Sequence, residues 1–90
     1  MLGSIVCTLE ISNSFAEWTD KFDNEEAPGR QAKGIKVLYR GVSTDSANKV
    51  VVIVQAEEGV IVQHIGENLA FFTANGARME TASPQAFLDC

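Results

Sequence analysis

The pattern of apolar and polar residues marks three short segments of the chain as strands, residues 4–11, 35–42 and 49–56. A period of two residues is typical of a strand with one buried face. The buried face of the first segment is predicted to hold Ile5, Cys7, Leu9 and Ile11. The two predicted faces of the second segment hold Ile35, Val37 and Tyr39 on one side and Lys36, Leu38 and Arg40 on the other. The third segment is apolar at nearly every position, which predicts a strand covered on both faces.

A helix is predicted to begin after the first strand, at Ser14. Ser14 and Glu17 have the spacing of a capping box, in which each side chain accepts a hydrogen bond from a backbone amide at the helix start. The stripe of this helix that faces the sheet is predicted to comprise Phe15, Trp18, Thr19 and Phe22. Pro28, Gly29 and Gly34 follow, so the next stretch is predicted to be a loop of about ten residues.

Residues 58–73 show the period of a second helix. Asn75 and Gly76 predict its end, because glycine readily adopts the left-handed conformation that terminates a helix. The apolar positions cover an arc of roughly 200°, wider than contact with a sheet requires. They are Val60, Ile61, Val62, Ile65, Leu69, Phe71 and Phe72. A short fourth strand is predicted over residues 77–82, and Ser83–Pro84 is predicted to begin a final turn that fixes Phe87 and Leu88.

The predicted order is strand, helix, strand, strand, helix, strand, in a single domain over residues 1–90. Right-handed crossovers in the two halves give the ferredoxin-like α+β fold, a four-stranded antiparallel sheet with two helices on one face. The first and third strands are expected in the centre, since they are the most uniformly apolar. The opposite face would then expose the apolar side chains of Val6, Leu38, Val51 and Ile53. We therefore expect a homodimer formed through these sheet faces.

Composition narrows the classes of partner. The chain has 90 residues and a net charge of −5, and this acidic balance argues against nucleic-acid binding, which depends on Lys and Arg. No apolar run approaches the roughly 18 residues of a membrane span, and the N-terminus lacks the features of a signal peptide. Cys7 and Cys90 alone make no disulfide framework, so a cytoplasmic protein is expected.

Basic residues gather in the middle of the chain despite its negative net charge. Residues 28–49 contain Arg30, Lys33, Lys36, Arg40 and Lys49 against the single acidic residue Asp45. One interpretation is an anion-binding site, and the other is ordinary solvation of a loop and an edge strand. The sequence favours the second interpretation, because the basic residues do not form a dense run.

Three segments resemble a family of small uncharacterised proteins found mainly in marine cyanobacteria and environmental sequences. The segments are residues 15–18 with Phe22 and Asp23, residues 34–42 and residues 49–59, within a resemblance that covers most of residues 4–82. This resemblance implies the dimeric α+β barrel superfamily, in which two ferredoxin-like protomers pack sheet against sheet. That superfamily includes cofactor-independent monooxygenases, muconolactone isomerases, haem-binding proteins and stress-responsive barrels. The resemblance therefore implies a fold without fixing an activity.

A cavity between the helices and the sheet is the expected ligand site. Its lining is predicted to comprise Trp18, Phe22, Val37, Tyr39 and Phe72, with His64 on the second helix and Arg40 at the mouth. His64, the only histidine, is either a general base or, more commonly for such a position, a histidine bonded to Glu67 or Asn68. Arg40 either anchors a ligand carboxylate or forms an ordinary salt bridge.

Three functions fit these residues. The favoured one is a homodimer that binds a small apolar or amphipathic ligand. The second is a cofactor-independent monooxygenase or isomerase, with His64 as base and Tyr39 or Arg40 polarising the substrate; few polar groups converge on the cavity, which disfavours an enzyme. The third is a purely structural or regulatory dimer. The sequence assigns no catalytic residue, no metal site and no cofactor.

Overall fold

The computed structural model describes residues 1–89, and Cys90 lies outside the described residues. Four strands and a series of short helices follow one another along the chain. They are β1 (Leu2–Ile11), α1 (Phe15–Asp20), the π-helical segment η1 (Lys21–Glu25), α2 (Ala27–Ala32), β2 (Lys36–Val42), β3 (Lys49–Glu57), α3 (Val60–Glu67), α4 (Leu69–Ala74) and β4 (Ala77–Leu88). Within residues 1–89, none of the helices has the length and apolar character needed to cross a membrane.

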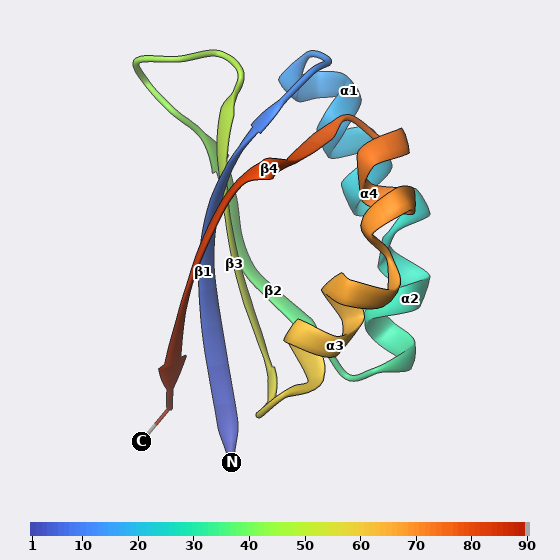
Figure 1. The fold of residues 1–90 in the computed structure, drawn as a ribbon, viewed down its shortest axis with the longest axis vertical. Coiled ribbons are helices and arrows are strands. Elements are labelled where there is room, and N and C mark those ends of the chain that lie inside the picture. Colours follow the sequence, from blue (N-terminus) through green and yellow to red (C-terminus); the bar gives the residue numbers. More distant parts are fainter. Residues whose placement is uncertain (90) are drawn as a thin grey trace.

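The four strands form one antiparallel sheet in the order β2-β3-β1-β4, which confirms the prediction that the first and third strands are central. All the helices lie on one face of this sheet (Figure 1). We call this face the inner face and the opposite one the outer face. The predicted ferredoxin-like α+β fold is therefore confirmed.

Alternate residues of the central strands point toward the helices and form most of the core. The buried strand residues are Ile5, Leu9, Ile11, Val50, Val52 and Ala56. Trp18, Phe22 and Ile61 are the large apolar residues that the helices bury against them. Burying each side chain of this size stabilises the fold by about 1.5–3 kcal/mol. This core holds α1, η1 and α3 in fixed positions over the inner face.

The start of α1 is as predicted. The Glu17 amide donates a hydrogen bond to Ser14 Oγ at 3.1 Å, and the Ser14 amide donates to Glu17 Oε1 at 3.3 Å. The loop predicted after this helix is wrong, because residues 21–25 continue as η1 and residues 27–32 form α2. Pro28 lies in the first turn of α2, where its missing N–H leaves no helical hydrogen bond unmade.

The predicted second helix is divided at Asn68 into α3 and α4. The backbone of Asn68 leaves the helical region, with φ −122° and ψ 17°. Because of this break, the predicted apolar arc is not buried as one surface, and Val62, Leu69 and Phe71 are exposed. The predicted stop at Asn75–Gly76 is confirmed, since α4 ends at Ala74 and Gly76 has a φ of +105°.

The last strand is longer than predicted. β4 continues to Leu88, so the turn expected at Ser83–Pro84 does not form. Pro84 is tolerated because β4 lies at the edge of the sheet, where one missing N–H need not break the ladder. The pairing of β1 with β4 is irregular between Thr8 and Glu10, and Thr81 Oγ1 accepts a hydrogen bond from the Glu10 amide at 2.8 Å.

A bulge in β2 reverses part of the predicted pattern. Across the strand pair, Val37 lies opposite Val54, Tyr39 opposite Ile53 and Arg40 opposite Val52. The bulge at Leu38 shifts the following residues by one position, which sends Tyr39 to the outer face and Arg40 to the inner face. Tyr39 lies over Gly41, where a Cβ atom would come within 2.6 Å of its hydroxyl oxygen. The prediction that Val37 and Tyr39 share a face is therefore wrong.

Candidate functional site

An internal cavity of about 100 Å³ lies between the inner face of the sheet and the helices. Trp18, Phe22, His64 and Phe72, four of the predicted site residues, line it. Apolar side chains from β1, β3, α3 and β4, with one from the segment before β2, complete the wall, namely Ile5, Cys7, Leu9, Ile35, Val52, Val54, Ile61, Ile65, Ala77, Met79 and Ala82. Glu26, Arg30 and His64 are the ionisable residues of the lining other than the Cys7 thiol, whose pKa is raised by burial. The cavity is therefore apolar with a few polar groups.

Aromatic rings form one side of the cavity. The rings of Trp18 and Phe22 stack with centroids 4.9 Å apart, and Phe15 extends the stack at 6.0 Å from Trp18. Phe72 meets the His64 imidazole edge to face at 5.8 Å. Such contacts fix the orientation of the rings, because aromatic pairs prefer offset or edge-to-face arrangements. The cavity wall is thus pre-formed by α1, η1, α3 and α4.

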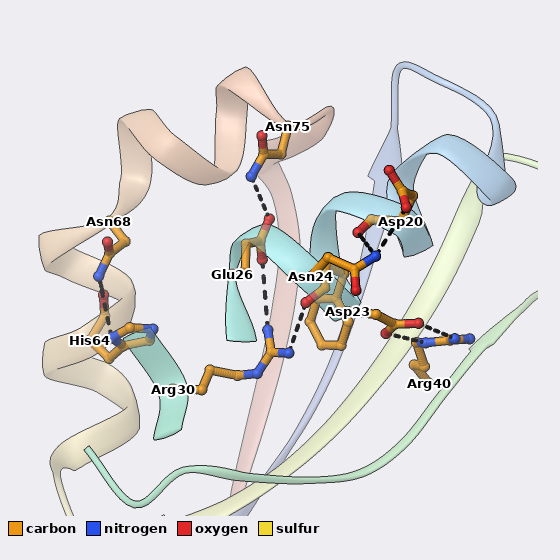
Figure 2. Close-up of polar contacts among 10 residues, drawn as sticks. Asp20, Asp23, Asn24, Glu26, Arg30, Arg40, His64, Asn68 and Asn75 are labelled. Carbon is orange, nitrogen blue, oxygen red and sulfur yellow. Dashed lines mark hydrogen bonds and ion pairs between the residues drawn. The ribbon is translucent and has the colours of Figure 1, made fainter. Parts of the chain in front are cut away.

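His64 presents one nitrogen that no protein group satisfies. The side chain is 6% exposed, and within residues 1–89 its Nε2 has no hydrogen-bond partner. Asn68 Nδ2 donates to the His64 carbonyl oxygen at 2.8 Å and lies 3.2 Å from His64 Nδ1 (Figure 2). The carbonyl contact identifies this atom as the amide nitrogen, so Nδ1 must accept and the ring proton is assigned to Nε2.

The imidazole is neutral near pH 7. Burial, followed by the positive charges of Lys33 and Arg30, lowers the pKa of His64 below its ordinary value of 6.5. In this tautomer the unpaired Nε2 is a hydrogen-bond donor and cannot accept a proton. The predicted contact between His64 and Asn68 is confirmed. His64 therefore keeps one buried N–H donor without a partner within the described residues, and its side chain lines the cavity.

A buried polar cluster lies at the junction of η1, α2 and α4. Asn75 Nδ2 donates to Glu26 Oε2 at 2.9 Å, and Arg30 Nη2 donates to the Phe22 carbonyl oxygen at 2.8 Å (Figure 2). The Arg30 guanidinium also lies 4.1 Å from the centroid of the Phe22 ring, a cation–π contact. Burial raises the pKa of the Glu26 carboxyl above its ordinary value, against the opposing effects of Asn75 and Arg30.

Three of the predicted site residues lie outside the cavity. Val37 packs against the core from β2 but does not line the cavity. Tyr39 lies on the outer face, with 56% of its surface exposed. Arg40 binds both carboxylate oxygens of Asp23, through Nε at 2.8 Å and Nη2 at 2.5 Å, so the salt-bridge interpretation is confirmed (Figure 2). The Arg40 guanidinium lowers the pKa of Asp23 through these hydrogen bonds.

The predicted cavity lining omits Glu26 and Arg30, although Arg30 belongs to the basic stretch noted in the sequence, because Pro28 and Gly29 between them suggest a loop. A signal is nevertheless present. Proline is favoured in the first turn of a helix, and a Glu–Arg pair spaced by four residues is typical of one helix face. Within residues 1–89, no group of three or more His, Cys, Asp or Glu side chains is placed to hold a metal ion.

Solved structures with the same fold include oxygenases. A variant of SnoaB, a cofactor-independent oxygenase from Streptomyces nogalater, is similar over 98% of this chain and 92% of that chain, with 16% identity and a TM-score of 0.70. A putative antibiotic biosynthesis monooxygenase from Bordetella bronchiseptica is similar over 99% and 97%, with 8% identity and a TM-score of 0.71.

A third structure is the monooxygenase ActVA-Orf6 of Streptomyces coelicolor in complex with nanaomycin D. It is similar over 98% of this chain and 87% of that chain, with 14% identity and a TM-score of 0.64. At these identities the likeness establishes the fold alone and nothing of the activity. A comparison with curated proteins gives no match. Residues 3–89 match the family described as a domain of unknown function, DUF3764, and the chain belongs to that family.

Proposed function

We propose that this protein binds a small apolar molecule that carries a hydrogen-bond acceptor, in the cavity between the inner face and the helices. The observation that carries the proposal is the unpaired Nε2–H of His64, buried in the lining of an otherwise largely apolar cavity. A buried donor without a partner costs about 1–3 kcal/mol. A ligand carbonyl or ether oxygen would remove that cost, whereas a purely apolar occupant would leave it in place.

The size of the cavity limits the ligand. An apolar cavity of about 150 Å³ accommodates benzene, so the 100 Å³ cavity suits a ring of about five carbons in its present form. Cyclopentanone and cyclopentane are therefore matched probes, since they differ in one acceptor oxygen. Titration of the protein with each probe can be followed by the NMR resonances of the His64 imidazole.

Cyclopentanone is expected to bind about tenfold more tightly than cyclopentane, which corresponds to about 1.4 kcal/mol. His64→Phe should abolish this preference, and Gln63→Ala, a change at an exposed neighbour on α3, should preserve it. Equal binding of the two probes to the wild-type protein would refute the role of His64. Native mass spectrometry of the freshly purified protein would in addition reveal a co-purifying ligand.

We also propose that two copies associate through their outer faces. Leu38, Tyr39 and Phe87 are exposed there, and Val6, Val51 and Ile53 are only half-buried. Apolar side chains left uncovered on a sheet face are typical of an interface, and a second copy offers the same surface. Light scattering at micromolar concentration is expected to give the mass of a dimer. A monomeric mass would contradict this part of the proposal.

A cofactor-independent oxygenase is the second candidate, and its support is the fold shared with SnoaB and ActVA-Orf6. The residues of this chain give it less support, because Tyr39 and Arg40 lie outside the cavity and the unpaired nitrogen of His64 already carries a proton. Oxygen uptake in the presence of cyclopentane-1,2-dione, an enolisable ring of matching size, with no added cofactor and with loss in His64→Phe, would favour the enzyme. Probe binding without oxygen uptake would favour the binding protein.

A further inference from the structure

An open groove between α2 and β2 adjoins the cavity. Phe22, Arg30 and Ile35 line both the groove and the cavity, so these three side chains form the boundary between them. We call this groove, together with its charged residues Asp23, Arg30 and Lys36, the α2–β2 groove. A molecule that enters the cavity from this side must pass Arg30.

Arg30 is unusual among the basic residues of the chain. It is 9% exposed, and within the described residues its side chain donates a single hydrogen bond, to the Phe22 carbonyl oxygen. The nearest carboxylate oxygen, Glu26 Oε1, lies 4.0 Å from Arg30 Nη1, too far for a hydrogen bond. A guanidinium has five N–H donors and stays protonated near neutral pH. Arg30 therefore retains donors for a further acceptor at the boundary of the groove and the cavity.

Glu26 does not fully compensate this charge. One of its carboxylate oxygens accepts a hydrogen bond from Asn75 instead of Arg30. Burial also raises the pKa of Glu26, which disfavours its charged form. The ion pair of Arg30 with Glu26, at 4.0 Å, therefore lacks a direct hydrogen bond, and a ligand carboxylate would provide a hydrogen-bonded partner.

The groove is locally positive on an acidic protein. The net charge of the chain is −5, yet the groove lining has the two cations Arg30 and Lys36 against one carboxylate, Asp23. Both oxygens of Asp23 are already engaged by Arg40. The fold thus brings together in one groove two basic residues of the 28–49 stretch, for which the sequence had favoured simple solvation. Such a local field attracts anions in preference to cations.

We propose that the natural ligand is a small apolar carboxylate, with its carboxylate on Arg30 in the α2–β2 groove and its apolar part in the cavity. This inference rests on the proposed binding function, because it uses the same cavity for the apolar part. The carboxylate would take the donors of Arg30 that the protein leaves open. The cavity size again favours an apolar part of about five carbons.

Cyclopentanecarboxylate and cyclopentanecarboxamide are the matched probes for calorimetric titration at pH 7 and low salt. The carboxylate is expected to bind the wild-type protein at least tenfold more tightly than the amide. Arg30→Met should abolish this preference while keeping much of the side-chain volume. Arg78→Gln, a change at an exposed arginine paired with Glu10 on another part of the sheet, should preserve it.

Arg30→Lys keeps the charge and provides a second variant if Arg30→Met does not fold, as judged by circular dichroism. Lysine lacks the planar fork that binds a carboxylate through two hydrogen bonds, so the preference should fall several-fold without vanishing. In the wild-type protein the preference should also weaken as salt rises to about 0.5 M. Equal affinity for carboxylate and amide would overturn the proposal, as would a preference unchanged in Arg30→Lys.

Two further probes separate this inference from the proposed function. If cyclopentanone binds but the carboxylate shows no advantage over the amide, the inference fails and the binding function stands. If none of the ring compounds binds, both fail. If inorganic phosphate binds as tightly as cyclopentanecarboxylate, the groove is an anion site that makes no use of the cavity, and the proposal is wrong.

Discussion

The two faces of the sheet are built from neighbouring residues yet have opposite properties. Val50 and Val52 point to the inner face, where helices cover them, while Val51 and Ile53 point to the outer face and remain half-exposed. The inner face carries a cavity lined mainly by apolar side chains, and the outer face mixes apolar residues such as Val51 and Ile53 with polar ones such as Ser4 and Gln55. Along β3, the face to which a residue belongs therefore alternates from one position to the next.

The largest loss of stability is expected from a charge placed on the inner face of β3. Val50→Asp puts a carboxylate at a position that is 1% exposed, and this should cost about 4–7 kcal/mol, the equivalent of a pKa shift of three to five units. Such a loss is comparable to the whole stability of a small domain. Urea unfolding or circular dichroism of the purified variant measures it.

Val51→Asp is the matched control one residue away. The folded monomer should survive this change, because the outer face is not enclosed by the chain's own helices, but the proposed dimer should dissociate in light scattering. If both variants unfold, or if both keep the fold and the dimer, the division of β3 into two faces has no energetic meaning.

A second contrast compares the single tryptophan with the single tyrosine. Trp18→Ala empties part of the inner core and should lower the free energy of unfolding by about 3–5 kcal/mol. Tyr39→Ala should change it by less than about 0.5 kcal/mol at concentrations where the chain is monomeric, because that side chain is exposed. Denaturant unfolding of both variants tests this, and a large loss in monomeric Tyr39→Ala would place that ring in the core.

A smaller loss of stability is expected at low pH from His64, which lies on α3 above the inner face. The pKa of His64 is lowered in the folded protein, so just below pH 6.5 the unfolded chain binds a proton that the folded chain does not. Stability should therefore fall as pH decreases through this window, by at most about 1.4 kcal/mol per pH unit. The dependence should disappear in His64→Phe.

Glu26 makes the opposite contribution to the pH dependence of stability. Its pKa is raised in the folded protein, so the stability that it contributes is lost as pH increases above the ordinary carboxyl value. Subtracting the pH profile of His64→Phe from that of the wild-type protein cancels this contribution, provided the two sites act independently. Gln63→Ala should keep the wild-type profile. Identical profiles for the wild-type protein and His64→Phe would mean that His64 titrates normally.

Regular patterns made the fold predictable from sequence. β1 follows a period of two and β3 is apolar at nearly every position, so their central position could be assigned. The capping box at Ser14 likewise depends on two side chains and one local hydrogen-bond pattern. In each case the information lies within a few neighbouring residues.

The candidate site was less predictable, because its errors come from local irregularities. A bulge at Leu38 moves Tyr39 out of the cavity, although Leu and Tyr are ordinary strand residues and give no warning of it. The break at Asn68 depends on a side-chain contact with the preceding turn. The cluster of Glu26, Arg30 and Asn75 joins segments that are distant in sequence, and only the assembled fold brings them together.

The position of Trp18 has a practical consequence. It is the only tryptophan of the chain, and its indole lines the cavity in contact with Phe22. An indole held in apolar surroundings emits at shorter wavelength than one in water, and a molecule beside it alters that emission. The protein thus contains its own optical reporter at the candidate site, so occupancy can be followed without a label or a known reaction.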